Sequence, residues 1–144
     1  MICLYQDISL LNISQGDEKM IDRELTNREK LMMKCVWAED QELSVQALQE
    51  KLKEMFGWDA KRSTVRTFLT SIEGKGFIRI ERRGRYSYII PTVDSDKYKT
   101  EQTLKMIDFW YGGSKVELIK SLYGSRLSEK NEQILREVFN EPVK

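Results

Sequence analysis

The side chains best suited to specific chemistry stand together in one short run of the sequence. The run combines long cationic groups with hydroxyls, and its members are Lys61, Arg62, Ser63, Thr64, Arg66 and Thr67. Arginine can donate two parallel hydrogen bonds to a guanine edge, while serine and threonine can bond bases or phosphates. The N-terminal part of an α-helix in the major groove of duplex DNA needs such groups. We therefore predict DNA contacts here, with Arg62 and Arg66 at the bases.

A second cationic set follows at Arg82, Arg83 and Arg85, around a single glycine. Arginines at such a tip suit phosphates or the neighbouring minor groove. The charge distribution supports both sets, because residues 57–91 carry eight basic and three acidic side chains although the chain as a whole is only +1. The alternative is an ordinary solvated face without a ligand.

Two helices are predicted before the first cationic run. Thr26 and Glu29 form a capping box, which indicates a helix over about 27–39. Ser44 is a typical N-cap for a second helix with apolar residues at three- and four-residue spacing. Gly57 supplies the left-handed stop for that helix, near residue 56.

A third helix and a β-hairpin complete the predicted domain. The helix should start close to Asp59 and end at Gly76, with the first cationic run on its outer face. Period-two alternation then predicts strands over 77–82 and 86–90, joined by a turn at 83–85. Three helices followed by a hairpin is the order of a winged helix-turn-helix. We therefore expect a mainly α fold with a small antiparallel hairpin and a winged-helix DNA-binding domain over 25–92.

Residues 93–144 are predicted to be helical, with breaks at Gly112-Gly113 and Gly124. Three short helices make a poor independent core, so the simplest use of their apolar stripes is to pack on a second copy of the chain. The alternative is that they fold back on their own winged helix. The predicted dimerisation residues are Leu104, Ile107, Trp110, Tyr111, Val116, Ile119, Leu122, Tyr123, Ile134, Leu135, Val138 and Phe139.

Other classes of function find little support in the composition. The chain has no histidine and only two cysteines, Cys3 and Cys35, so we expect no metal site, no cofactor and no enzyme. No apolar stretch is long enough for a membrane span and no signal peptide opens the chain, which predicts a cytoplasmic protein. Residues 1–24 have no assigned role; an arm, an added strand or a leader before Met20 all remain open.

Several motifs together resemble the penicillinase and methicillin-resistance repressor family (BlaI/MecI/CopY). The resemblance spans about residues 25–140 and implies a homodimeric repressor that covers a promoter and leaves when a signal arrives. The motifs that carry it are Leu25-Thr26, Glu29, Met33 and Trp37, then Trp58, Lys61 and Thr64–Leu69, then Lys75–Ile78, Arg85–Tyr88, Tyr111–Ser114 and Leu127–Glu129.

The chain departs from this family pattern in three places. The stretch from Trp58 to Thr64 is about two residues longer than usual, which affects the start of the third helix. No cysteine follows Cys35, whereas the copper-responsive branch carries a C-terminal cysteine cluster. The antibiotic-responsive branch is cut by a membrane protease at an Asn-Phe bond, where this chain reads Ser121-Leu122-Tyr123.

The function that the residues and the resemblance favour is repression through a pseudopalindromic operator in double-stranded DNA. A signal-dependent protease is the further partner that the resemblance implies. The competing interpretation is a winged-helix protein–protein adaptor whose basic face meets an acidic partner.

Overall fold

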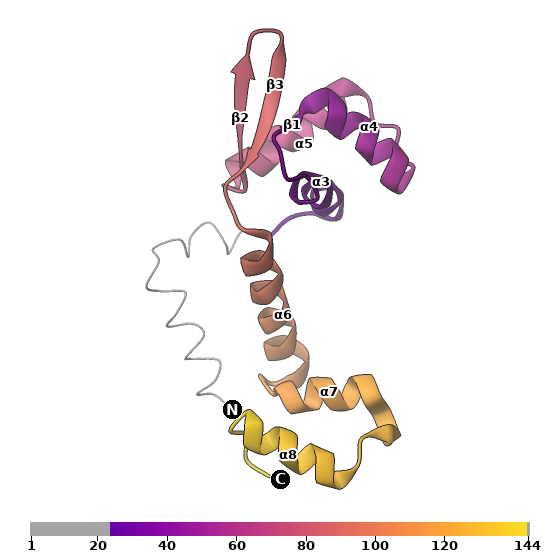
Figure 1. The fold of residues 1–144 in the computed structure, drawn as a ribbon, viewed down its shortest axis with the longest axis vertical. Helices are drawn as coiled ribbons and strands as arrows, with labels where there is room; N and C mark the ends of the chain where they lie inside the picture. The colour runs from indigo at the N-terminus through magenta and orange to yellow at the C-terminus, as the bar shows by residue number, and fades with distance from the viewer. Residues whose placement is uncertain (1–23, 144) are drawn as a thin grey trace. The chain divides into compact units, whose positions relative to one another are not determined.

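The computed structural model describes residues 24–143, which fall into two compact units, 24–95 and 96–143 (Figure 1). The first contains helices α3 to α5 and a small sheet, and the second contains helices α6 to α8. The expected mainly α fold with a small antiparallel sheet is thus confirmed. Except for Glu24, the unassigned segment 1–24 lies outside the described residues. No helix within 24–143 has the length and apolar character needed to cross a membrane.

Helix α3 spans Asn27–Trp37 and starts with the predicted capping box. The hydroxyl of Thr26 accepts a hydrogen bond from the Glu29 N–H at 3.3 Å, and the Glu29 carboxylate accepts one from the Thr26 N–H at 2.7 Å. Two N–H groups that a helix start leaves unpaired are thereby satisfied. The helix ends two residues earlier than expected, where Ala38 turns the chain.

Helix α4 spans Val45–Phe56, as predicted. The Ser44 hydroxyl accepts from a backbone N–H of the first turn at 3.1 Å. At the other end Gly57 has φ +64°, and the next N–H, that of Trp58, donates to the Leu52 carbonyl at 3.2 Å. A side chain with a Cβ would be strained at this φ, which explains the glycine.

Helix α5 spans Arg62–Gly74, so its predicted start close to Asp59 was wrong by three residues. Ala60 is buried, and its carbonyl accepts a hydrogen bond from the Gln49 side chain of α4 at 3.0 Å. This contact keeps the segment before the helix extended up to Lys61, whose ψ is 152°. The long α4–α5 connection therefore packs on α4 instead of adding a helical turn.

The sheet has three antiparallel strands in the order β1-β3-β2. Strands β2, Ile78–Arg83, and β3, Tyr86–Pro91, form the predicted hairpin, which projects past the helices of its unit (Figure 1). Its turn contains only Gly84 and Arg85, with Gly84 at φ +62°, so Arg83 belongs to the strand. Strand β1, Leu43–Ser44, was not predicted, because two residues show no alternation.

The core of the first unit is formed by the inner faces of all three helices together with the hairpin. Its most deeply buried large apolar side chains are Met32, Met33, Leu48, Leu52, Leu69, Ile72, Phe77 and Ile89. Because helix α5 turns its apolar stripe inward, its opposite face is left to solvent.

The second unit has four helical segments, and its breaks lie where the glycines predicted them. Helix α6 spans Ser95–Tyr111, α7 spans Lys115–Tyr123, a 3₁₀ turn covers Gly124–Arg126, and α8 spans Glu129–Val138. Gly112 and Gly113 have φ values of +58° and +83°, a conformation that ends α6.

A buried charged network joins α7 to α8. Arg136 is 4% exposed, and its guanidinium donates to the Glu117 carboxylate at 3.0 Å. Glu141, also buried, accepts from the Lys115 N–H at 2.9 Å and the Val116 N–H at 3.3 Å. The carboxylate of Glu141 thus caps α7 from a distant point of the chain, where the positive end of the helix dipole favours it.

A second charged contact ties the end of α5 to the start of α3. Lys75 donates to the Glu29 carboxylate at 2.6 Å and to the Glu24 carbonyl at 2.9 Å, and Glu29 is only 1% exposed. Burial raises the pKa of Glu29, but hydrogen bonds from Lys75, Thr26 and Ser71 outweigh it and lower the pKa to about 2. Glu29 therefore stays ionised in the folded protein.

This pKa predicts how stability depends on pH. The folded pKa of Glu29, about 2, lies below its ordinary value of 4.5, so its contribution is complete above pH 4.5 and disappears as the pH falls toward 2. Replacing Glu29 by Gln should lower the free energy of unfolding by about 3 kcal/mol at pH 7 and by much less at pH 2. Urea unfolding at several pH values measures this, with Glu24→Gln as the control. Parallel pH profiles for wild type and Glu29→Gln would contradict the assignment.

Candidate nucleic-acid interface

The predicted DNA-reading residues occupy the start and outer face of α5. Lys61 is the N-cap, and the helix buries Val65, Leu69 and Ile72 on its other side. Thr64 is half-buried, whereas the other five candidates are exposed: Lys61, Arg62, Ser63, Arg66 and Thr67. The structure therefore gathers the whole predicted run on one accessible region.

Arg62 and Arg66 are free to donate. They are four residues apart, which places them on the same face of the helix. Within residues 24–143 neither guanidinium forms an ion pair, although carboxylates engage several other basic groups of this unit. Both side chains can therefore direct their donors to an external acceptor.

The two outward threonines of α5 are arranged differently. The Thr67 hydroxyl donates to the Ser63 carbonyl at 3.0 Å, and the Thr70 hydroxyl donates to the Arg66 carbonyl at 2.9 Å. Each hydroxyl proton is thus used inside the helix. The remaining contacts open to these residues are acceptance by oxygen and apolar contact by the methyl group, which suit base amino groups and thymine methyls better than phosphates.

The hairpin continues the surface of α5. The Ile80 N–H of β2 donates to the Glu73 carboxylate of α5 at 2.7 Å. A small pocket of about 100 Å³ lies between helix and hairpin and is lined in part by Arg66, Thr70 and Ser87. The outer face of α5 and the side of the wing therefore form one continuous region.

The three wing arginines differ in their surroundings. Arg85 is exposed in the turn, and Arg82 makes only a long hydrogen bond of 3.4 Å to the Gly84 carbonyl. Arg83 instead donates to the Glu42 carboxylate with both terminal nitrogens, one of them at 2.9 Å. Its hydrogen bonds to the carboxylates of Glu42 and Glu81 raise the pKa of Arg83. Arg82 and Arg85 can therefore donate hydrogen bonds to an external acceptor, whereas the donors of Arg83 are used by Glu42 and Glu81.

Residues 57–91 contain eight basic side chains, and three of them pair with carboxylates. The other five have no acidic partner in the described chain. Lys75 is bound to Glu29, Arg79 lies 3.8 Å from Glu81, and Arg83 is bound to Glu42. The five that remain, called the basic face below, are Lys61, Arg62, Arg66, Arg82 and Arg85. Ser87 beside α5 and Glu42 beside Arg83 were missed from the sequence, since neither belongs to a local motif.

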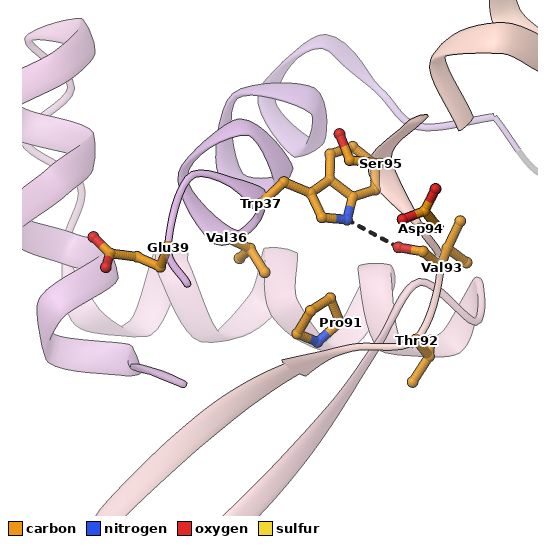
Figure 2. Close-up of a pocket in the computed structure, with 8 residues that line it drawn as sticks. All are labelled: Val36, Trp37, Glu39, Pro91, Thr92, Val93, Asp94 and Ser95. Carbon is orange, nitrogen blue, oxygen red and sulfur yellow. Dashed lines mark hydrogen bonds between the residues drawn. The ribbon is translucent and has the colours of Figure 1, made fainter. Parts of the chain in front are cut away.

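A larger hollow of this unit, of about 380 Å³, lies elsewhere and has the wrong charge for DNA. It lies between the end of α3 and the chain after β3 (Figure 2). Its charged lining residues are Glu39 and Asp94, and Glu39 pairs with Lys51. Across it the Trp37 indole donates to the Val93 carbonyl at 3.0 Å (Figure 2). We assign the hydrogen bond a structural role, because it holds the chain after β3 against α3.

The predicted dimerisation residues fall into three groups by exposure. Ile107 and Val116 are buried, so this conformation gives a partner no access to them. Leu104, Tyr111, Ile119, Leu135 and Phe139 are half-buried, and Trp110, Leu122, Tyr123, Ile134 and Val138 are exposed. Phe109, which was missed, is 76% exposed and packs edge-to-face on Trp110 at 4.8 Å. The only indication of Phe109 in the sequence was its position next to Trp110, a member of the predicted apolar stripe.

Three helices, a hairpin and an unpaired basic face define the class of protein: a winged helix-turn-helix protein with an added helical unit. Within residues 24–143 no cluster of three or more potential metal ligands occurs. The chain matches the sequence profile of the penicillinase repressor family over residues 25–141, and it belongs to that family. The family consists of transcriptional repressors, a regulatory and not an enzymatic class. Among curated proteins none matches the chain.

Proposed function

We propose that the chain represses transcription as a homodimer that binds a pseudopalindromic operator, with α5 in the major groove. The observation that carries the proposal is the basic face, whose five cations have no acidic partner within the described residues. Unpaired cations on one surface release counterions when they meet phosphates, and this release drives binding. An operator in the cell's own DNA places the protein in the cytoplasm.

The side chains of the proposed interface have distinct roles. Arg62 and Arg66 contact base edges, because they lie in the first turns of the helix that enters the groove. Arg82 and Arg85 contact phosphates or the minor groove beside the operator half-site. Lys61, Ser63, Thr64 and Thr67 complete the contacts to bases and backbone at the helix start.

The general proposal predicts measurable binding to duplex DNA of any sequence. A labelled random 30-base-pair duplex should bind weakly at low salt, and the logarithm of the binding constant should fall linearly with the logarithm of salt concentration, by about 0.9 per phosphate contact. Fluorescence anisotropy measures this. If no binding occurred at low salt, the basic face would have to serve a protein partner instead.

Side chains that contact base edges should affect which DNA sequence the protein prefers. A preferred duplex can be selected from a random pool, and replacing Arg62 or Arg66 by Ala should then cost about 1–3 kcal/mol on that duplex and much less on random DNA. Arg126→Ala is a matched control, since Arg126 is an exposed arginine of the second unit. Equal losses on both duplexes would mean that Arg62 and Arg66 touch only phosphate.

The second unit supplies the proposed dimer contact. Eight of the ten large apolar side chains that are exposed within residues 24–143 belong to it, among them Phe109 at 76%, Trp110 at 72% and Leu122 at 67%. Exposed apolar groups gathered in so small a unit are typical of a surface that another protein covers. A two-fold dimer buries the same face on both copies and presents two α5 helices to successive turns of DNA.

The dimer is tested by placing a charge on this face. Leu122→Glu combined with Val138→Glu should turn a dimer into a monomer, because both side chains are exposed and would meet apolar groups only in the partner. Light scattering measures the mass, and affinity for a two-half-site duplex should fall about 100-fold as the tether is lost. Met55→Glu, at an exposed apolar residue of the first unit, is the control. An unchanged mass for the double variant would place the dimer contact elsewhere.

A signal-dependent protease is proposed as the partner that ends repression. The 3₁₀ turn Gly124–Arg126 is exposed throughout, and exposed connections are where proteases cut most readily.

A further inference from the structure

We propose that Glu42 keeps Arg83 away from the DNA backbone, so that Arg83 positions the wing while its neighbours Arg82 and Arg85 bind phosphate. This inference rests on the proposed DNA binding. Arg82, Arg83 and Arg85 then have different roles, although they are all arginines next to the same turn and the sequence alone does not distinguish them.

The contacts of the Arg83 guanidinium leave few donors for a phosphate. Both terminal nitrogens face the two oxygens of Glu42, with Nη2 2.9 Å from Oε1, and Nε donates to the Glu81 carboxylate at 3.0 Å. The guanidinium carbon also lies 5.2 Å from the centre of the Tyr88 ring. Such a fork on a carboxylate is the strongest arrangement that arginine forms with an acid. A phosphate would have to replace it.

The same contacts join the wing to the helix-turn-helix. Glu42 directly precedes β1, in which Leu43 pairs with Ile89 and Ser44 pairs with Tyr88. Ser44 is also the N-cap of α4. Strand β1 has only two residues, so the bond from Arg83 to Glu42 adds a third attachment between the hairpin and the start of α4. Arg83 is therefore well placed to set the direction of the wing.

Local charge separates Arg83 from the other two arginines. The carboxylates of Glu42 and Glu81 face the guanidinium of Arg83, and Arg79 also lies 3.8 Å from Glu81, so the charge of Arg83 is balanced locally. Arg82 and Arg85 have no acidic partner in the described chain. A phosphate near Arg83 would therefore meet no net positive charge. Glu42 therefore weakens binding that depends on charge alone, which increases the relative preference for the operator.

The experiment is a comparison of salt slopes on the random duplex. Arg85→Gln should reduce the slope by about one, the loss of one phosphate contact. Arg83→Gln should leave the slope unchanged and weaken binding about two- to fivefold, through the wing position that an exposed ion pair helps to hold. Glu42→Gln should steepen the slope by about one, because the freed Arg83 can then bind phosphate.

A double-mutant cycle separates this effect from a general change in charge. In the Glu42→Gln background, Arg83→Gln should reduce the slope by about one, although it has no effect on the slope in the wild type. Asp40→Asn, which removes an exposed acid from the same loop, is the matched control and should leave the Arg83 result unchanged. Thermal unfolding checks that each variant folds.

Two results would overturn the inference. A slope reduced by about one in Arg83→Gln alone would make Arg83 a phosphate contact. An identical effect of Arg83→Gln with and without Glu42 would remove the role of Glu42. Arg85→Gln separates this inference from the proposed function. If Arg85→Gln reduces the salt slope, the wing binds DNA whatever the result for Arg83. If the wild type shows no salt-dependent binding, the proposed function itself fails.

Discussion

Burial of one side of α5 is the constraint on which the rest of the molecule depends. Val65, Leu69 and Ile72 are at most 1% exposed, so the rotation of this helix about its axis is determined by the core. With 3.6 residues per turn, Arg66 then lies outside the buried stripe, and Arg62, the first residue of the helix, is exposed as well. The contact of Lys75 with Glu29 holds the end of α5 to the first helix of the same unit. The outer face of α5 can therefore vary in sequence without loss of the core.

The helices and the hairpin could be predicted because their signals are local: caps, periodicity and glycines lie within a few residues of the positions they determine. The start of α5 could not, since it depends on Ala60 packing against α4 and accepting from Gln49. The ion pair of Arg83 could not be predicted either, because its partner Glu42 lies 41 positions earlier in the chain. Burial of Ile107 was missed for the same reason: a stripe of apolar residues does not distinguish an internal contact from one with a partner.

The second unit shows how a short helical segment can be ordered with few buried apolar side chains. Arg136 contacts the carboxylates of Glu117 and Glu132, and Glu141 caps α7. Charged hydrogen bonds of this kind demand a particular geometry, so they specify how α7 meets α8 while the apolar groups remain outside. This division suits the dimer contact proposed for the unit.

The back-bonded threonines of α5 have a consequence for chemical marks on DNA. With the hydroxyls of Thr67 and Thr70 turned to carbonyls of their own helix, their methyl groups are the apolar part left for contact in the groove. Such a methyl packs on the C5-methyl of thymine, and a cytosine methylated at C5 presents the same group at the same edge. In the proposed complex, cytosine methylation under α5 would therefore resemble a change of base, and such a mark would shift the preferred site without altering the DNA sequence.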